Sequence, residues 1–205
     1  MPAMRVLLSL ALLFTAGQMA LANEPAGTVS AQPQAAQEAM GPLSPDDARL
    51  DSLYQQLKKE RHPESARAIA EQIRNLYSIS GSATVDMLMK NALIAMGEKR
   101  YGAALDFLDQ VTLLAPDYAE GWNRRAALHY LMGNSGKAMA DTARALALEP
   151  RHIGALSGLA GILQQTGRDE DALKAWEAYL SFYPADREAQ KQALELTTRL
   201  EGRKT

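Results

Sequence analysis

The chain has 205 residues, with 22 basic and 24 acidic side chains, a formal net charge of −2 and no cysteine. This charge balance leaves no basic footprint for nucleic acid. The lack of cysteine excludes disulfides, thiolate catalysis, iron–sulfur clusters, cysteine zinc sites and a lipoprotein anchor. Hydrophobic residues make up 47% of the chain and aromatic residues only 6%, a composition that favours packed helices over sheets.

The first 22 residues have the features of an export signal. Arg5 gives a positive start, an apolar run follows from Val6 to Phe14, and Ala20-Leu21-Ala22 is a small-x-small cleavage sequence. The run is far shorter than the ~20 residues that span a bilayer. We therefore predict cleavage after Ala22 and no stable membrane insertion afterwards, with an uncleaved N-terminal anchor as the alternative.

Residues 23–43 are rich in Ala, Gln, Pro and Gly and predict a disordered spacer.

Residues 44–84 predict two helices. Ser44 is a good N-cap with Pro45 in the first turn, and Pro63 opens a second helix; apolar residues follow both starts at helical spacing. We interpret this segment as a degenerate first repeat or N-terminal cap that extends the array described next.

A regular repeat organises residues 85–186. The same residue type, or a similar one, recurs at one fixed spacing in several columns, and each unit places a large residue, a small residue, an alanine and a closing proline in that order. Proline ends each unit because it lacks an amide hydrogen and disfavours helix in the residue before it. The main columns are Pro116, Pro150 and Pro184; Ala104, Ala138 and Ala172; Ala92, Ala126 and Ala160; Leu88, Trp122 and Leu156; and Gly133 with Gly167.

The period and the columns resemble the tetratricopeptide repeat, a helix-turn-helix unit of about 34 residues. The resemblance implies an all-α fold, an α-solenoid with repeats at 85–118, 119–152 and 153–186, followed by a C-terminal capping helix at 187–205. Two departures stand out. Asn91 and Arg125 occupy a column where the family usually has Leu, as Leu159 does, and the first repeat is expected to turn early, at Gly97.

No catalytic or metal-binding pattern is found. His62, His129 and His152 are widely separated and lie outside any H-E-x-x-H motif. We expect His129 to have a packing or edge role and His152 to cap or hydrogen-bond locally. The acidic run Asp169-Glu170-Asp171 is interpreted as favouring the dipole at a helix start. The sequence therefore predicts a non-enzymatic protein without a cofactor.

The family register implies a concave groove lined by the first helix of each repeat. Its mixed apolar and polar lining suits a peptide or protein segment better than a small metabolite, and its shortage of basic residues argues against a clamp for a C-terminal carboxylate. The candidate residues are Asp86, Met89, Leu93, Met96, Glu120, Asn123, Arg124, Ala127, Tyr130, Gly154, Ser157, Gly158, Gly161 and Gln164.

Two features of this groove give specific hypotheses. Gly154, Gly158 and Gly161 fall on one helix face and predict a shallow trough for the backbone of a partner; the alternative is that the C-terminal helix or a twin subunit fills it. Arg125 and Asn91 are expected to form a polar seam between the first helices of neighbouring repeats, unless Arg125 extends its charged head to water.

Signal, spacer and short array together resemble small exported tetratricopeptide proteins of Gram-negative bacteria. The segments SGSATVDMLM, EGWNRRA and PRHIGALSGL are similar to one such proteobacterial family. This resemblance implies a periplasmic adaptor that binds a protein or peptide in cell-envelope maintenance or assembly. The alternatives are a structural subunit that oligomerises or joins an envelope complex, and an accessory regulator of an envelope enzyme.

Overall fold

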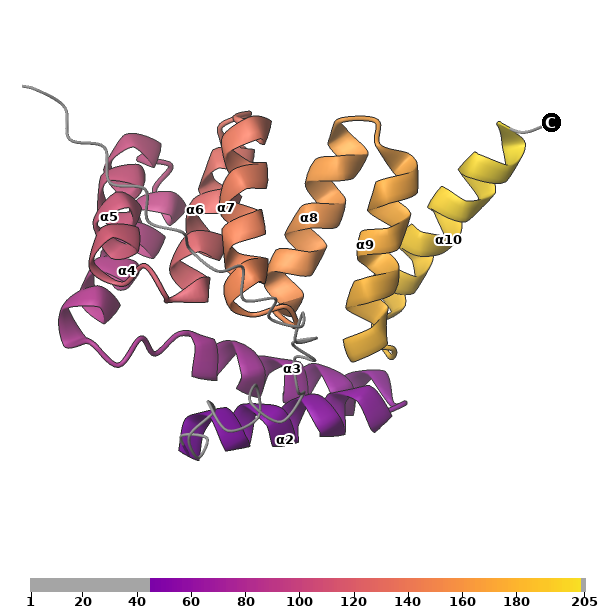
Figure 1. The fold of residues 1–205 in the computed structure, drawn as a ribbon, viewed down its shortest axis with the longest axis horizontal. Helices are drawn as coiled ribbons and strands as arrows, with labels where there is room; N and C mark the ends of the chain where they lie inside the picture. The colour runs from indigo at the N-terminus through magenta and orange to yellow at the C-terminus, as the bar shows by residue number, and fades with distance from the viewer. Residues whose placement is uncertain (1–44, 204–205) are drawn as a thin grey trace, which may run out of the picture. The chain divides into compact units, whose positions relative to one another are not determined.

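The computed structural model describes residues 45–203, so the predicted signal peptide (1–22) and spacer (23–43) lie outside the described residues. The described residues form α-helices joined by short turns, and no strand occurs among them (Figure 1). The predicted all-α solenoid is confirmed. The helices are α2 (Pro45–Lys59), α3 (Pro63–Tyr77), α4 (Ala83–Gly97), α5 (Tyr101–Leu114), α6 (Ala119–Leu131), α7 (Ser135–Leu148), α8 (Ile153–Gln165), α9 (Asp169–Phe182) and α10 (Arg187–Gly202).

Helices α4 to α9 form three antiparallel pairs that stack side by side (Figure 1). Within each pair, fully buried alanines such as Ala92 and Ala104 allow the two backbones to approach closely. Larger residues such as Leu108 and Leu128 fill the space between neighbouring pairs. The small and large columns of the repeat therefore correspond to helix contacts within and between units.

The turns inside the three pairs share one backbone conformation. Lys99, Gly133 and Gly167 occupy the same position of successive repeats and have φ angles of 58°, 76° and 74°. The left-handed conformation explains glycine at two of these places, because only glycine adopts it without steric cost. The expectation that the first repeat turns early at Gly97 is wrong: Gly97 is the last residue of α4, and Lys99 takes the turn position in register.

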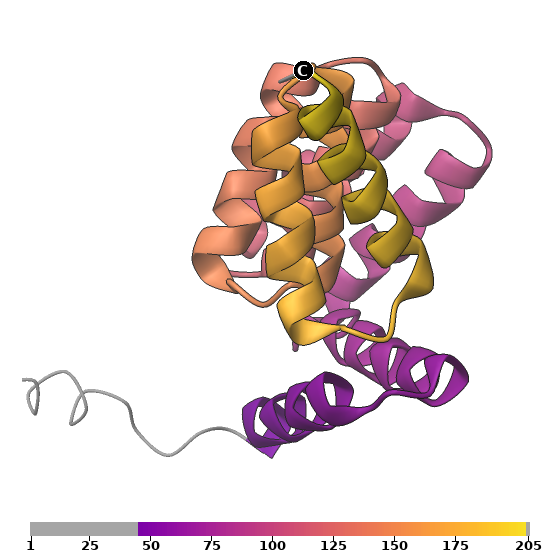
Figure 2. The same cartoon turned by 90° about the vertical axis from the view of Figure 1, so that its right-hand side faces the viewer.

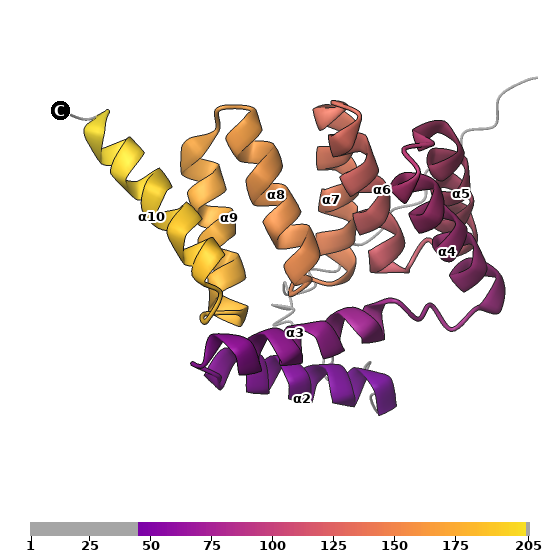
Figure 3. The same cartoon turned by 180° about the vertical axis from the view of Figure 1, so that it is seen from behind.

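The α2–α3 hairpin does not continue the stack. It lies across the inter-repeat loops at one end of α6 to α9, as two views agree (Figures 1 and 3). Its apolar face shares a core with α8, α9 and the start of α10 instead of covering α4. The expectation that residues 44–84 extend the array at its N-terminal end is therefore corrected. The fully buried hairpin residues of this core are Leu57, Ala66, Ala70 and Ile73, and their buried partners include Ile153, Leu156, Tyr179, Tyr183 and Ala189.

Tyr77, the last residue of α3, ties the hairpin to two successive inter-repeat loops. Its carbonyl accepts a 2.7 Å hydrogen bond from the Tyr118 hydroxyl, in the loop before α6. Its ring stacks on His152, in the loop before α8, with centroids 4.4 Å apart. Tyr54 of α2 adds a 2.7 Å hydrogen bond to the Arg151 carbonyl, and burial raises the pKa of the Tyr54 hydroxyl to about 12.

Helix α10 packs along α9 at the C-terminal end of the array (Figure 2). It buries Ala189 and Leu196, and its N-cap Asp186 accepts hydrogen bonds from the Glu188 and Ala189 amides. Buried Asp169, at the start of α9, forms ion pairs with Arg199 and Arg203. Between residues 45 and 203, no helix is both long enough and apolar enough to cross a membrane.

Candidate functional site

A groove of about 350 Å³ runs between α6 and α8. We call it the α6–α8 groove. Its walls are mostly apolar, and the three glycines of α8 form one side. The lining residues are Asn123, Ala126, Ala127, Tyr130, Leu131, Thr142, Gly154, Ser157, Gly158, Gly161 and Ile162.

The glycines keep this groove open. A Cβ atom placed at Gly158 would meet no atom within 4 Å in the described part of the chain, and one at Gly161 would meet only the Tyr130 hydroxyl, at 4.0 Å. Gly154 is tighter, because a Cβ there would lie 3.2 Å from Asn123 Nδ2. Since α10 packs on α9, the C-terminal helix does not fill the trough, and that alternative is wrong for the described residues.

The amphipathic pattern of α8 explains this geometry. Leu156, Ala160 and Leu163 recur at helical spacing and are buried against neighbouring helices. The glycines occupy the opposite side of the same helix, where a side chain would narrow the groove. Placing glycine in a helix interior costs roughly 0.5–1 kcal/mol relative to alanine, so the open face is obtained at the expense of helix stability.

A buried polar cluster adjoins the groove at Asn123. Glu120 accepts hydrogen bonds from Asn123 Nδ2 at 2.7 Å and from Arg124 Nε, and His152 Nε2 lies 3.0 Å from Glu120 Oε2. His152 Nδ1 accepts the Ala155 amide hydrogen at 3.1 Å. Because Nδ1 accepts, a neutral ring carries its proton on Nε2, the nitrogen nearer to Glu120. The expectation that His152 caps locally is confirmed.

The charge of Glu120 is stabilised despite its burial. Burial alone would raise its pKa, but the hydrogen bond from His152 and the charge of Arg124 outweigh it, so the pKa of Glu120 falls below its usual range. The carboxylate therefore fixes Asn123, which lines the groove, and Arg124, which does not.

The candidate residues divide into three groups: residues that line the groove, residues that are buried, and residues that lie elsewhere. Asn123, Ala127, Tyr130, Gly154, Ser157, Gly158 and Gly161 line the α6–α8 groove. Two of the others were expected to face the groove and do not. Met89 is only 5% exposed and belongs to the core around α4 and α5. Glu120 is equally buried, beneath the groove edge. In both cases a helix position near the groove boundary packs against the neighbouring helix.

Arg124 pairs with Glu120 and does not line the groove, and the remaining candidates also lie outside it. Asp86 accepts two hydrogen bonds from Ser80 and fixes the loop before α4. Gln164 donates to Gln192 of α10 and accepts from Trp176 of α9. Leu93 is exposed on α4 and Met96 is half-buried, and neither borders the groove. The first repeat therefore adds no lining to the cavity that α6 and α8 form.

Arg125 is not part of a seam between first helices. It donates two hydrogen bonds of 2.8 Å to the Asp141 carboxylate on α7, and others to Asp109 and Thr112 on α5. Its guanidinium also lies 4.7 Å from the centroid of the Trp122 ring. The expected polar seam of Arg125 and Asn91 between first helices is wrong for Arg125, because the second helices supply its partners.

His129 is buried on α6, 3.9 Å from Asp141, and burial lowers its pKa. This position agrees with the expected packing role. Among residues 45–203, no group of three or more potential metal ligands comes together.

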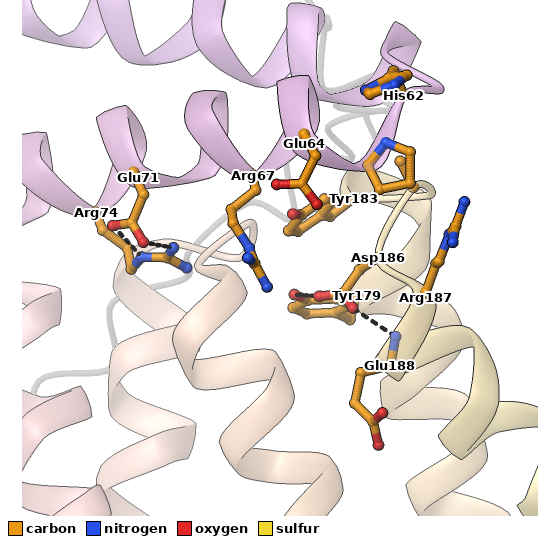
Figure 4. A pocket seen from close by; sticks show the side chains of 12 residues that line it. His62, Glu64, Arg67, Glu71, Arg74, Tyr179, Tyr183, Asp186, Arg187 and Glu188 are labelled. Carbon is orange, nitrogen blue, oxygen red and sulfur yellow. Dashed lines mark hydrogen bonds and ion pairs between the residues drawn. The ribbon is translucent and has the colours of Figure 1, made fainter.

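A second cavity, of about 930 Å³, lies between α3 and the junction of α9 with α10. Arg67 extends into it from α3, and the Tyr179 hydroxyl donates to Asp186 at 2.6 Å on the opposite side (Figure 4). Arg74 is paired with Glu71 along the rim (Figure 4). Acidic and basic side chains are mixed around this cavity, in contrast to the apolar groove.

Sequence reasoning missed four residues of the α6–α8 groove: Ala126, Leu131, Thr142 and Ile162. Ala126 and Ile162 have the pattern of core residues and are buried. Thr142 belongs to a second helix, so a rule that assigns the groove to first helices omits it. Leu131 lies four residues after the candidate Ala127, and this helical spacing is a signal that could have identified it.

The comparisons with known proteins agree with this architecture. No family model matches the chain. A TPR repeat-containing protein of Rhizobium etli is 49% identical over 185 residues, which cover 90% of this chain and 91% of that protein.

Solved structures with this fold share less sequence with the chain. The first TPR of Spaghetti (RPAP3), bound to an HSP90 peptide, is 20% identical with a TM-score of 0.56, over 58% of this chain and 95% of that chain. The Sgt2 TPR domain from Aspergillus fumigatus is 22% identical with a TM-score of 0.55, over 58% and 81%. The Yersinia enterocolitica chaperone SycD, in complex with a YopD peptide, is 16% identical with a TM-score of 0.51, over 59% and 92%. These structures share the fold, and the Rhizobium relative shows the family: the chain belongs to the tetratricopeptide-repeat (TPR) proteins.

Proposed function

We propose that the chain is a non-enzymatic periplasmic adaptor that binds a peptide or protein segment in the α6–α8 groove, in the maintenance or assembly of the cell envelope. The observation that carries the proposal is the open glycine face of α8, where a Cβ at Gly158 would meet nothing within 4 Å in the described residues. An apolar trough without side chains on one wall suits close approach of a partner backbone.

The chemistry of the groove indicates an apolar ligand segment. Arg124 is held by Glu120, so it is not available as a clamp for a C-terminal carboxylate. The oxygen atoms of Asn123, Ser157 and Tyr130 lie at the walls and can accept hydrogen bonds, whereas Asn123 Nδ2 and the Ser157 hydroxyl proton are used within the protein. Two structural neighbours, Spaghetti (RPAP3) and SycD, were solved with bound peptides, which supports a peptide or protein ligand here.

The periplasmic part of the proposal rests on the sequence. Arg5, the short apolar run and the Ala20-Leu21-Ala22 sequence predict export and cleavage. N-terminal sequencing of the mature protein should begin at Asn23, and fractionation should place the product in the periplasm. Retention of Met1 with persistent membrane association would contradict this part.

Crosslinking from the groove tests ligand binding. A photoreactive amino acid at Ser157, in the native cell, should trap a defined adduct. Gly158→Leu fills the trough and should abolish the adduct while leaving the fold intact, because the space is empty. Gly136→Leu is the matched control: Gly136 is also an exposed helical glycine with no atom within 4 Å of its Cβ position among the described residues, but it lies on α7 outside the groove. An adduct that survives Gly158→Leu would overturn groove binding.

A further inference from the structure

Two sets of equivalent repeat positions occur on the first helix of each pair and on α10. Both columns follow the period of the repeat. On α6 they face the preceding helix α5, since Gly121 lies against Val111 and Leu128 shares a core with Leu108. The members are Met87, Gly121, Ala155 and Ala189 in one column, and Ile94, Leu128, Ile162 and Leu196 in the other.

In α6, α8 and α10 both columns are buried. The preceding helices α5, α7 and α9 pack against α6, α8 and α10; for example, Leu128 shares a core with Leu108 and Val111 of α5. On α4 the equivalent residues are open: Met87 is 56% exposed and Ile94 is 46% exposed. The two residues are two helical turns apart and lie on one face of the helix.

The position before α4 is open because the α2–α3 hairpin is used elsewhere. In a regular array α3 would precede α4 and cover Met87 and Ile94. Instead Ala66, Ala70 and Ile73 of α3 are fully buried in the core shared with α8 and α9. Moving the hairpin to α4 would expose that core, so the hairpin is an unsuitable occupant of this face.

We propose that the Met87–Ile94 face of α4 binds an amphipathic helix of a partner protein, placed against α4 as α5 is placed against α6. This surface lies on a different helix from the α6–α8 groove and does not depend on the proposed groove ligand. The three filled positions of the array define the geometry of the interface.

The same positions specify the chemistry of the partner helix. Where α6 has Gly121, the Val111 side chain of α5 approaches so closely that a Cβ would lie 2.7 Å from its Cγ1. Met87 occupies this column on α4 and needs far more room, so the partner must carry Ala or Gly opposite it. Ala145 of α7, one repeat period after Val111, is such a residue.

Charge favours a partner helix over a second copy of this chain. Lys90 lies midway between Met87 and Ile94, is exposed, and forms no ion pair within residues 45–203. A two-fold pairing of α4 with α4 would bring the two Lys90 side chains together, which is unfavourable. An acidic residue on the partner helix would instead pair with Lys90.

A peptide probe tests the surface directly. We would label a synthetic peptide of residues 135–150, the α7 sequence that carries Ala145, and titrate it with the mature protein while following fluorescence anisotropy. Saturable binding is expected. The double variant Met87→Glu/Ile94→Glu should weaken it by about tenfold or more, and its circular dichroism should be unchanged because both residues are exposed.

Two variants locate the binding. Leu113→Glu is the matched control, because Leu113 is 78% exposed and its repeat equivalents Ala147 and Ser181 lie outside the core as well; it should bind like the wild type. Gly158→Leu should also bind normally, which separates this face from the groove. Absence of saturable binding, or binding unaffected by the double variant, would overturn the proposal. A dimer in sedimentation that Ile94→Glu dissociates would assign the face to a second copy and overturn it too.

Discussion

Arg125 shows how a residue that breaks the repeat pattern can be accommodated. Its column is normally apolar, yet the side chain is bound by acidic and hydroxyl groups of α5 and α7 and lies over the Trp122 ring. Asp141 is buried beside it. A buried carboxylate needs a partner, because its desolvation is otherwise uncompensated.

We therefore expect Arg125→Leu to destabilise the protein. Removing the guanidinium leaves the Asp141 carboxylate unpaired, which should lower the free energy of unfolding by about 1–3 kcal/mol. Urea denaturation followed by circular dichroism measures this change. Arg168→Leu is the control, since Arg168 pairs with Asp171 at an exposed site and should change the value by less than about 1 kcal/mol. A stability equal to the wild type in Arg125→Leu would show that the network contributes nothing.

The buried Glu120 makes stability depend on pH. Because its folded pKa lies below the ordinary value of about 4.3, the carboxylate contributes stability above that pH, and the contribution is lost as the pH falls through the folded pKa. Glu120→Gln removes this titration. The difference in unfolding free energy between wild type and Glu120→Gln should therefore be largest near pH 7 and should shrink below about pH 4.

Denaturation curves between pH 3 and pH 8 would measure that difference. Glu177→Gln, at an exposed position in the middle of α9, is the control and should unfold like the wild type. If the difference in unfolding free energy between wild type and Glu120→Gln stays constant across this range, the Glu120 carboxylate is not the source of the pH dependence.

The sequence could not place Met89 and Glu120 correctly. Both lie near the edge of the face that the repeat register assigns to the groove, and a small rotation about the helix axis decides between groove and core. For Glu120 the deciding partner is His152, one repeat away, and the sequence alone does not show that the two side chains meet. The glycine face of α8 was predictable because it depends only on spacing within one helix.

A helical glycine can be replaced at a gain or a loss of stability, depending on the space around it. Gly158 of α8 and Gly121 of α6 represent the two cases. At Gly158 a methyl group would meet nothing within 4 Å in the described chain, whereas at Gly121 of α6 it would meet Val111 at 2.7 Å. Gly158→Ala should raise the unfolding free energy by roughly 0.5–1 kcal/mol through helix propensity. Gly121→Ala should lower it by about 1–3 kcal/mol through overpacking.

Thermal and urea denaturation of the two variants would compare them under one condition. If the unfolding free energies of Gly158→Ala and Gly121→Ala change in the same direction, the two glycines do not differ in packing. A lower unfolding free energy in Gly158→Ala would indicate that another part of the protein packs against the glycine face of α8 in solution.

The helices differ in how well their positions could be predicted from the sequence. Each repeat carries its own turn residue, small contacts and closing proline within a single period, so the pairs α4–α5, α6–α7 and α8–α9 follow from local pattern. The hairpin carries helix signals just as clearly, but its position depends on contacts with residues far along the chain, such as that between Tyr54 and Arg151. Helical periodicity identifies an apolar face without naming what covers it.

At the scale of the whole chain, the described residues depart from a simple array. Stacked repeats normally contact only their neighbours, so their stability is nearly a sum of local terms. Here the hairpin contacts the loop before α6, the loop before α8 and the core of α9 together, and Tyr77 takes part in the first two contacts. The hairpin should therefore couple units that an ordinary solenoid leaves independent.

We expect Tyr77→Ala to weaken this coupling as well as the hairpin itself. The variant removes the ring that stacks on His152 and the hydroxyl that lies 3.0 Å from the Tyr54 hydroxyl. The loss should be about 2–4 kcal/mol, and amide hydrogen exchange should accelerate at the start of α8 as well as in α2 and α3. Tyr77→Phe keeps the ring and should lose only about 1 kcal/mol, with α8 still protected. If Tyr77→Ala accelerates exchange in the hairpin alone, while the amides of α8 keep their wild-type rates, the hairpin is an appendage and the three repeats are stable without it.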